Sequence, residues 1–420
     1  MKYCGVKDKD IIKAVEEYRT PLYIYDKAKI KEQYDYLKEN IPRQFSIYYS
    51  MKANPLLGIC EIYKSLGSGI EVASAGEIYV ALEAGFKGKD ILFTSPAKSE
   101  DELKFAIQND VYCINAESIE ELNIINELAV KHNKVVDIGL RINPDFDLNG
   151  ASMKMTGIPT QFGIDQPLIK EAFKILKNLH NIKLVGIHVY TGSHILNVEN
   201  IINNFEGIFK LANDLQIKYN FDMKVLDIGG GFGIPYFKSE SSLDMITLKV
   251  KLQELWNRYV SSFRDTRIII ESGKFLMAES GDYVVSLLYK KHCKGINYLI
   301  CNGGINHHEP VSILGKRNFP VDIIVRGNIN REVQEEVYDI VGPLLTTRDL
   351  IGRKMKLLSP EVGDLLVLRN SGAYGLTHST SAFLSHETPA EVIVDEGKIF
   401  LLRERGNYKD YINSQKHLCR

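Results

Sequence analysis

The sequence predicts a (β/α)8 barrel followed by a mostly β domain, and three observations support this fold class. Eight short β-prone runs, each followed by a helical pattern, occupy roughly 230 residues from about residue 45, which suits such a barrel. Helix-start signals follow several of these runs. After about residue 275, strand-like runs separated by turn signals replace the helical patterns. A doubly wound open sheet is the competing interpretation.

The predicted barrel strands are short apolar runs. In order they are Phe45–Tyr49, Gly69–Val72, Ile91–Thr94, Val111–Asn115, Val135–Ile142, Lys183–Tyr190, Lys224–Ile228 and Arg267–Glu271. Ser-x-x-Glu, the pattern of a capping box, occurs just beyond three of these strands, where a helix is expected to begin. The pairs are Ser74 with Glu77, Ser99 with Glu102, and Ser118 with Glu121. Their regular placement favours strands that alternate with helices.

The predicted β domain consists of further short runs. They are Gly281–Tyr289, Asn297–Cys301, Phe319–Arg326, Asp364–Leu368, Glu391–Val394 and Lys398–Leu402. Near the N-terminus, Pro21–Tyr25 is a strand candidate that could join either part. We assign residues 26–275 to the barrel, and residues 1–25 and 276–420 to the β domain.

Composition excludes several classes of protein. The 420 residues include 52 Lys and Arg against 53 Asp and Glu, so a dedicated nucleic-acid or acidic-membrane binder is disfavoured. No apolar stretch approaches the length of a membrane helix, and the N-terminal residues lack a signal-peptide core. The six cysteines are scattered without the spacing of a zinc site or a disulfide scaffold. We therefore expect a cytoplasmic protein without nucleic-acid, membrane or metal partners.

The first candidate functional residue is Lys52, which follows the first predicted strand in Tyr48-Tyr-Ser-Met-Lys-Ala-Asn54. Functional residues of a barrel lie at the carboxyl ends of its strands. A solvent-facing lysine is the simpler interpretation. An amine among aromatic and apolar neighbours, however, has a lowered pKa and can form a Schiff base with an aldehyde.

Glycine-rich turns follow the seventh and eighth strands, where barrel phosphate sites recur. The first is Leu226-Asp-Ile-Gly-Gly-Gly-Phe-Gly233, and the second is Glu271-Ser-Gly-Lys274, which ends in a cation. Backbone N–H groups in such turns can close on a phosphate, although flexible turns are the alternative.

The sixth strand contributes His188 and Tyr190, which share one face if both lie in the strand. They are either core residues or a platform on which a flat cofactor stacks. Glu271 could pair with a protonated pyridine nitrogen. The sequence therefore favours pyridoxal 5'-phosphate as the cofactor. The features that support this choice are expected around the rim of the barrel mouth: Lys52, the glycine turns, the pair of His188 and Tyr190, and Glu271.

With these residues in place, the sequence strongly resembles the fold type III pyridoxal-phosphate decarboxylases, which include the diaminopimelate, ornithine and arginine decarboxylases. The resemblance covers nearly the whole chain. It rests on Tyr-Ser-Met-Lys-Ala-Asn around Lys52, Glu71–Glu77, Arg141–Pro144, Gly229–Phe232, Glu271–Lys274 and Ser371–Tyr374. The segments Ile187–Gly192, Lys154–Gly163 and Asn370–Tyr374 look closest to the butirosin-pathway branch, which decarboxylates glutamyl groups on an acyl-carrier protein.

The resemblance implies an alanine-racemase-like barrel, a homodimer with active sites at its interface, and roles for single residues. Lys52 is the implied Schiff-base lysine, Glu271 pairs with the pyridine nitrogen, and Tyr190 stands where most relatives stack a histidine on the ring. The implied phosphate ligands are Ser193, Gly229, Gly230, Gly231, Gly273 and Lys274, with Tyr374 from the partner subunit. Glu71 and His188 complete the cofactor-binding candidates.

Three positions depart from the family pattern. Leu345 stands where relatives have a cysteine that protonates the α-carbon across the dimer. Lys274 replaces the usual arginine, which exchanges a bidentate fork for a point charge. Asn302 replaces a common aspartate. Either another group donates the proton, or oxidation or transamination follows decarboxylation, or the chain is a cofactor-binding regulatory homologue. Racemisation would need a second acid or base, for which no candidate is found.

Substrate choice in the family depends largely on the segment between Gly304 and Phe319. Lys316 and Arg317 in this segment favour a distal carboxylate or a phosphopantetheine arm, although a solvated basic loop is an equal alternative. Thr346 and Asp349 are further substrate-binding candidates. The expected substrate is an amino acid or an aminoacyl group on a carrier protein.

Overall fold

The computed structural model describes residues 5–146, 153–154, 157–237, 239–309, 320–326 and 334–418. The chain divides into two compact units. One comprises residues 34–235 and 241–275, and the other comprises residues 1–33, 236–240 and 276–420. We describe each unit by itself, as the barrel unit and the sheet unit.

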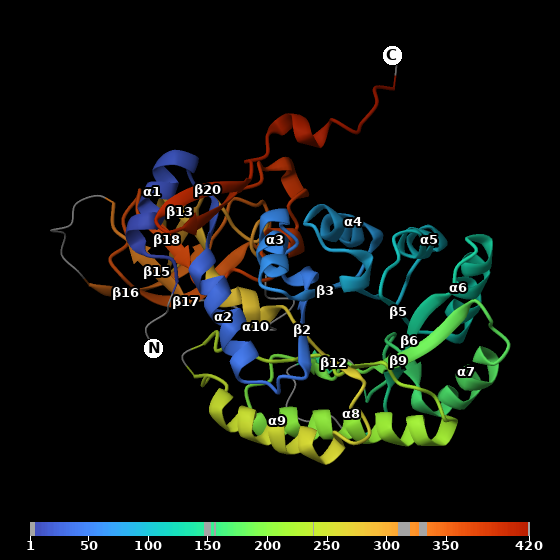
Figure 1. Cartoon of the computed structure of the whole chain (residues 1–420). Helices are drawn as coiled ribbons and strands as arrows, with labels where there is room; N and C mark the ends of the chain where they lie inside the picture. Colours follow the sequence, from blue (N-terminus) through green and yellow to red (C-terminus); the bar gives the residue numbers. More distant parts are fainter. Residues whose placement is uncertain are drawn as a thin grey trace. The chain divides into compact units, whose positions relative to one another are not determined.

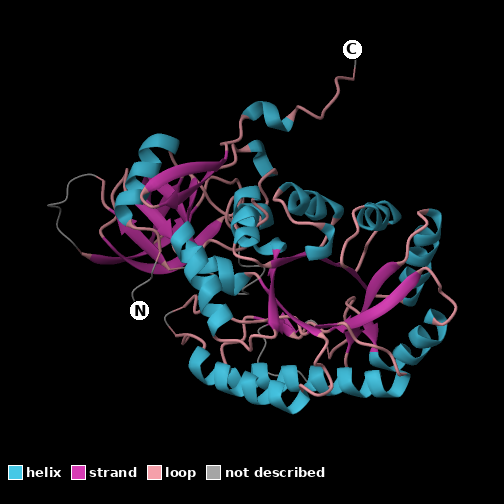
Figure 2. Cartoon of the chain, viewed as in Figure 1, coloured by secondary structure: helices cyan, strands magenta, loops and turns pink. Residues whose placement is uncertain are grey.

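In the barrel unit, eight parallel strands of the described chain close into a ring with helices outside it (Figures 1 and 2). The pairing order is β5-β4-β3-β2-β12-β11-β9-β6, and pairing of β5 with β6 closes the ring. This closure confirms the predicted barrel, and the open-sheet alternative is wrong. The strands are β2 (Phe45–Ser50), β3 (Gly69–Val72), β4 (Ile91–Thr94), β5 (Cys113–Ala116), β6 (Val136–Asn143), β9 (Ile182–His188), β11 (Val225–Asp227) and β12 (Arg267–Ser272).

The sixth barrel strand is shorter than the sequence predicts. β9 ends at His188, so Tyr190 lies beyond the strand, and the expectation that both residues share one strand face is wrong. After β9 the chain leaves the barrel sheet. Its next residues form a short strand, β10 (Gly192–Ser193), which pairs with another short strand, β7 (Met153–Lys154). A further short strand, β8 (Ile164–Asp165), pairs with β6.

The helices around the barrel begin largely as their capping sequences predict. They are α3 (Leu57–Ser65), α4 (Ala75–Glu83), α5 (Glu100–Gln108), α6 (Ile119–Lys131), α7 (Ile169–Leu176), α8 (Val198–Tyr219) and α9 (Met245–Tyr259); α2 (Lys27–Glu39) precedes the first barrel strand. The hydroxyls of Ser74, Ser99 and Ser118 accept the expected backbone N–H bonds of α4, α5 and α6. Glu102 completes a reciprocal capping box with Ser99. Glu77 and Glu121 instead accept from the N–H groups of Ala73 and Glu117.

A cluster of buried side chains fills the barrel interior. Tyr48 contributes its ring from β2, and Leu92, Val185 and Ile269 approach it from other strands. A Cβ at Gly69 would lie 2.5 Å from the Tyr48 ring, so this position requires glycine. The barrel is therefore a packed support for the side chains at its carboxyl end rather than a pore.

The sheet unit is built around one large sheet in the order β17-β16-β14-β13-β1-β19-β20, with β18 paired to both β13 and β15. The strands are β1 (Leu22–Asp26), β13 (Gly281–Cys293), β14 (Ile296–Cys301), β15 (Val321–Ile324), β16 (Glu335–Val341), β17 (Leu350–Leu358), β18 (Leu365–Leu368), β19 (Ala390–Asp395) and β20 (Lys398–Arg403). Helix α1 (Asp8–Tyr18) packs its apolar side chains into the core of this unit. The N-terminal strand β1 pairs with β13 and β19, so it belongs to this sheet.

Sequence patterns did not predict β16 and β17. The exposed start of β16 carries two glutamates, and β17 contains Gly352 and a run of basic residues. Lys354 in β17 also has a positive φ of 51°, which interrupts regular strand alternation. Neither segment therefore has the apolar alternation by which a strand is predicted.

In the described part of the chain, no helix combines the length and apolar composition that crossing a membrane requires.

Candidate active site

Polar side chains from five barrel strands or their following turns gather at the carboxyl end of the barrel. They are Lys52 after β2, Glu71 on β3, His188 on β9, Asp227 on β11 and Glu271 on β12. Strands β2, β12, β11 and β9 are successive neighbours, and β3 adjoins β2. This is the face on which barrels carry their reactive groups.

Lys52 projects from a short 3-10 turn, Met51–Ala53, whose other two residues are buried. Its Nζ lies 3.5 Å from Glu71 Oε2 and 5.5 Å from the centre of the Tyr190 ring. The Lys52 side chain is 44% exposed whereas that of Glu71 is 2% exposed, and the Ser50 hydroxyl donates to the same Glu71 oxygen. The fixed carboxylate and ring hold an accessible amine at the barrel mouth.

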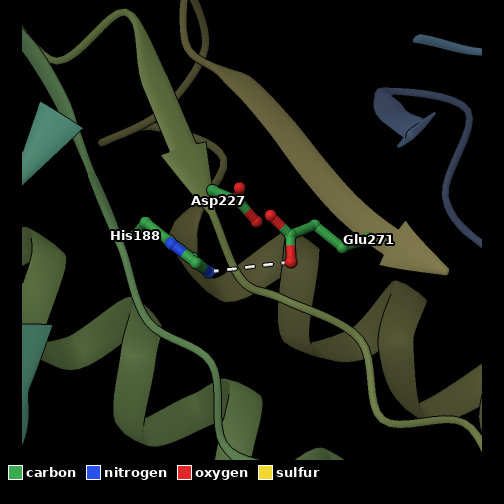
Figure 3. A group of neighbouring side chains, drawn as sticks. All are labelled: His188, Asp227 and Glu271. Carbon is green, nitrogen blue, oxygen red and sulfur yellow. Dashed lines mark ion pairs between the residues drawn. The ribbon is translucent and has the colours of Figure 1, made fainter. Parts of the chain in front are cut away.

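His188, Asp227 and Glu271 form a buried triad (Figure 3). One ligand atom from each lies within 4.8 Å of the other two, and His188 Nε2 is 3.8 Å from Glu271 Oε2. Burial raises the pKa of Glu271 well above its usual range, and the neighbouring Asp227 raises it further. Burial also raises the pKa of Asp227. Two carboxyl groups this close and this buried do not both ionise readily.

The glycine turn after β11 is packed against β12. Gly229 and Gly231 have positive φ values of 63° and 94°, which glycine adopts without strain. The Gly229 N–H donates to Asp227 Oδ1 at 2.9 Å, and the Glu271 N–H donates to the Gly229 carbonyl at 2.9 Å. A Cβ at Gly230 would lie 1.8 Å from the Glu271 carbonyl oxygen. The turn is therefore closed tightly enough to present backbone N–H groups in one direction.

Gly230→Ala tests this packing. The new methyl group forces the turn away from β12, so we expect the affinity for an anionic ligand of the turn to fall by roughly 100-fold or more. Gly76→Ala is the matched control because its Cβ would find only Ser74 Oγ, at 3.7 Å. Equilibrium binding of pyridoxal phosphate measures the effect. Equal affinities of Gly230→Ala and the control would contradict it.

Ser193, Gly273 and Lys274 also lie in the barrel unit. Ser193 ends the short strand β10 and interacts with Tyr190, whose pKa burial raises. A Cβ at Gly273 would lie 2.8 Å from Ala53 Cβ and 3.0 Å from the Ser50 carbonyl oxygen, so this turn packs on the Lys52 turn. Lys274 is 4% exposed and begins the short helix α10 (Lys274–Met277). The second predicted phosphate turn thus adjoins the lysine turn.

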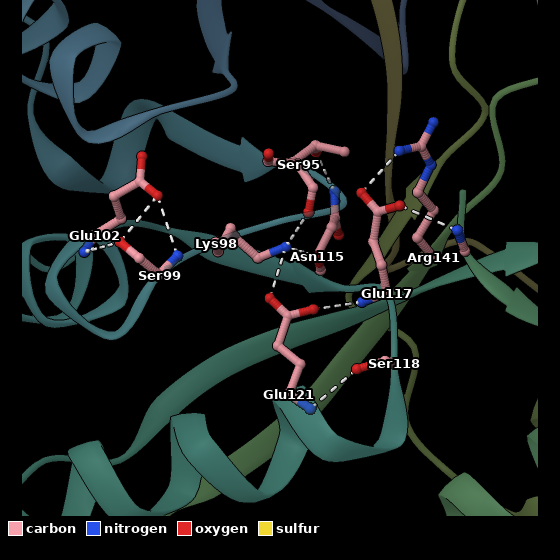
Figure 4. Close-up of polar contacts among 11 residues, drawn as sticks. Ser95, Lys98, Ser99, Glu102, Asn115, Glu117, Ser118, Glu121 and Arg141 are labelled. Carbon is pink, nitrogen blue, oxygen red and sulfur yellow. Dashed lines mark hydrogen bonds and ion pairs between the residues drawn. The ribbon is translucent and has the colours of Figure 1, made fainter. Parts of the chain in front are cut away.

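A buried ion-pair network lies on β6, the neighbour of β9, and in the segments that follow β4 and β5 (Figure 4). Arg141 Nη1 pairs with Glu117 Oε1 at 2.7 Å, and Lys98 pairs with Glu121 at 2.7 Å. The Glu117 N–H donates to Glu121, which joins the two pairs.

Burial lowers the pKa of His188 well below its usual range, and the charges of Arg141, Lys52 and Lys98 lower it further. His188 is therefore neutral at ordinary pH.

The other predicted residues lie in the sheet unit or outside the described residues. Tyr374 has a positive φ of 55°, and its ring lies 6.1 Å from that of His378. Lys316 and Arg317 are outside the described residues. Tyr374 belongs to the sheet unit, and its role in phosphate binding stays a prediction.

The segment that contains Leu345 is a surface loop. Leu345 is 90% exposed, whereas Asp349 is buried and accepts from the N–H groups of Ile305 and Leu344 at 2.9 and 2.7 Å. Thr346 Oγ1 accepts from the Arg348 N–H at 3.3 Å. Asp349 thus stabilises the loop, and its predicted contact with substrate stays untested.

Sequence reasoning missed the roles of Asp227, Arg141 and Glu117. Asp227 directly precedes the glycine turn, and the sequence pattern of that turn predicts only a phosphate site. Its position as the last residue of β11 was the available signal, because the carboxyl ends of barrel strands carry functional groups. Glu117 follows β5 in the same way, but its partner Arg141 lies 24 residues away and only the fold brings them together.

Residues 27–278 match the family model for the pyridoxal-dependent decarboxylases, described as their pyridoxal-binding domain. The chain belongs to this family. The chain is 37% identical over 415 residues to the L-glutamyl-[BtrI acyl-carrier protein] decarboxylase of Niallia circulans, covering 97% of this chain and 96% of the relative. It is 30% identical over 403 residues to the diaminopimelate decarboxylase of Campylobacter jejuni, covering 94% and 96%.

Solved structures agree with this membership. Diaminopimelate decarboxylase from M. jannaschii superposes with a TM-score of 0.88 at 26% identity, over 97% of this decarboxylase and 94% of the neighbour. The Helicobacter pylori enzyme complexed with L-lysine gives 0.86 at 28% identity, over 96% and 98%. The fold class, the pyridoxal phosphate cofactor and the carboxy-lyase activity follow, and a purely regulatory homologue is not favoured.

The side chains of this decarboxylase fit the cofactor. Both ring nitrogens of His188 are buried without a hydrogen-bond partner among the described residues, and they lie beside the hydrogen-bonded carboxyl groups of Asp227 and Glu271. Such buried polar atoms usually have partners, and a polar ring bound here would supply them. The glycine turn beside them leaves no room for a Cβ and suits a phosphate. By distance alone the triad could also hold a metal ion, but the family match favours the pyridine ring.

Proposed function

We propose that this enzyme decarboxylates an aminoacyl group, glutamyl or a close analogue, that is attached to an acyl-carrier protein. The observation that carries the proposal is the 37% identity over nearly the full length to a glutamyl-carrier-protein decarboxylase, against 30% to a diaminopimelate decarboxylase. The departure at Leu345 and the basic pair Lys316–Arg317 in the specificity segment agree with a substrate other than a free diamino acid.

The catalytic amine is that of Lys52. Bound pyridoxal phosphate supplies an aldehyde for this amine and a ring that withdraws the electron pair of the bond to carbon dioxide. Lys52 would hold the cofactor covalently, and its amine would be released when the substrate amine takes its place. Glu71, 3.5 Å from its Nζ, stabilises the ammonium form while Lys52 is released.

Glu271 holds a proton at the pyridine nitrogen, because a buried carboxylate strongly favours an adjacent cation. The ring of Tyr190, 5.5 Å from Lys52 Nζ, would pack against the bound cofactor and exclude water. The turns at Gly229–Gly231 and Gly273–Lys274, with Ser193, bind the phosphate and fix the ring orientation. Together these residues align the breaking bond without taking part in it.

The protein is expected to act as a homodimer in which Tyr374 of one subunit reaches the phosphate held by the other. Leu345, in the sheet unit, carries no transferable proton, so it cannot protonate the α-carbon of the substrate. The ammonium of Lys52, released when the substrate binds, is the group that we assign to protonating the α-carbon. Support comes from its 44% exposed side chain, which is long enough to move within the mouth.

A second candidate, decarboxylation of free diaminopimelate, is suggested by the diaminopimelate decarboxylases that match 93% or more of the chain. The test measures carbon dioxide release and product mass with five substrates: glutamyl-carrier protein, free glutamate, diaminopimelate, lysine and ornithine. We expect kcat/KM for the carrier-linked substrate to exceed that for any free amino acid by at least about 100-fold. Preference for diaminopimelate would reject the proposal in favour of the second candidate.

A further inference from the structure

A cavity of about 450 Å³ lies in the sheet unit, against one face of β13, β14 and β16 and beside the loop that joins β16 to β17. Lys291, Tyr298 and Asp339 pair across these three strands, so their side chains form one row on this face. The cavity has the size of a cleft that holds a small organic ligand.

The charged groups of the cavity differ in accessibility. Lys291 and Arg353 are exposed, whereas Asp339 and Asp349 are 9% and 3% exposed. Asp339 Oδ1 accepts the Lys354 N–H at 2.7 Å, and each oxygen of Asp349 accepts a backbone N–H. The carboxylates therefore serve the fold of the sheet and its loop. The two cations are the charged groups that an incoming ligand can contact most easily.

The uncharged part of the lining suits an elongated chain with amide groups. Ile300 and Val341, which pair across β14 and β16, contribute apolar surface. Tyr298, Thr346 and Thr347 contribute hydroxyl groups, which can donate to or accept from an amide. A ligand that combines one phosphate with a chain of amide and apolar segments matches the cations, the hydroxyls and the apolar surface together.

We propose that this cavity binds the phosphopantetheine arm of the carrier protein, with the phosphate at Lys291 and Arg353 and the amide-bearing chain against the sheet. The inference rests on the proposed function, because a carrier-linked substrate is what brings such an arm. Charge complementarity supports it, since phosphate oxygens form strong hydrogen bonds with lysine and arginine. A free amino acid has no chain long enough to fill the cavity.

Cys293 provides a reporter of binding within the cavity. It lines the cavity and is exposed, whereas the other described cysteines, Cys60, Cys113 and Cys301, are buried. Its alkylation by iodoacetamide is followed by peptide mass spectrometry. The probe is S-methyl phosphopantetheine, whose sulfur is capped, and S-methyl pantetheine is the same compound without the phosphate. We expect the phosphate-bearing probe, at several times its Kd, to slow alkylation of Cys293 at least about fivefold. The other compound should protect much less at the same concentration.

Lys291→Ala tests the cation that the proposal assigns to the phosphate. We expect it to weaken binding of the phosphate-bearing probe by about tenfold, because a charged hydrogen bond is lost. Lys290→Ala is the matched control. Lys290 is the preceding residue of β13, its side chain lies on the opposite face, and it pairs with Glu361 at 2.9 Å. The control should show the protection of the unmodified protein.

Turnover of the carrier-linked substrate gives a second readout. Lys291→Ala should raise KM for this substrate by about tenfold, with the loss falling on KM rather than on kcat, because the arm lies away from the reacting atoms. Equal protection by the two compounds would overturn the inference, as would equal protection in Lys291→Ala and the unmodified protein. Turnover of the carrier-linked substrate without any protection rejects the cavity but keeps the proposed function. Phosphate-dependent protection without such turnover rejects the proposed function and keeps the cavity as a phosphopantetheine site.

Discussion

Lys52→Ala is expected to lower kcat by at least about a thousandfold, because the variant has no amine that can hold the cofactor covalently. The loss follows from chemistry rather than from folding. The Lys52 side chain is 44% exposed and lies beside Glu71 and Tyr190 at the barrel mouth, so its truncation leaves no buried cavity. Carbon dioxide release and the absorbance of the lysine-linked cofactor measure the result.

Two further variants make the interpretation specific. Lys52→Arg keeps a cation near Glu71, but a guanidinium group stays protonated and forms no Schiff base with the cofactor. This variant should therefore be as inactive as Lys52→Ala. Lys64→Ala, on α3, removes a surface lysine paired with Asp90 and should retain full activity. If Lys52→Ala turns over at the rate of the unmodified protein, another group holds the cofactor.

Arg369→Met is expected to lower the free energy of unfolding by about 3–5 kcal/mol, because it leaves a buried carboxylate without its counter-charge. Arg369 lies in the sheet unit and is 6% exposed. It donates to Asp282 Oδ2 at 2.8 Å, to Asp322 at 2.8 Å and to the Val6 carbonyl at 3.0 Å. It therefore ties the segment just before α1 to β13 and β15. Denaturant unfolding monitored by circular dichroism measures the loss.

The effect should depend on pH with a defined sign. Burial raises the pKa of Asp282 to about 6 even with Arg369 present, and removal of the cation raises it further. The folded variant then binds more protons than the unfolded chain, so its stability falls as pH rises above the unfolded pKa of Asp282 and recovers as pH falls.

Two controls separate this pair from an ordinary surface ion pair. Lys290→Met breaks the partly exposed Lys290–Glu361 contact of 2.9 Å and should cost about 0–1 kcal/mol. Adding Asp282→Asn to Arg369→Met removes the stranded charge and should restore part of the stability. A loss below about 1 kcal/mol in Arg369→Met would show that the pair is not effectively buried.

Most of the barrel was predictable because its signals are local. Gly69–Val72 and Ile91–Thr94 have the predicted bounds, since each is a short apolar run with a turn at both ends. The capping serines were predictable for the same reason, because their bonds reach only three residues along the chain. β16 escaped prediction because its exposed glutamates obscure the alternation.

The sequence by itself determined the order of the barrel strands and helices, the lysine after the first barrel strand and the glycine turns after the last two. These features depend on residues that are close along the chain. Only the tertiary structure decided that Asp227, Glu271 and His188 meet within 4.8 Å, and that Arg141 pairs with Glu117. The reason is that barrel closure brings the carboxyl ends of distant strands together, where burial changes the proton affinities of their side chains.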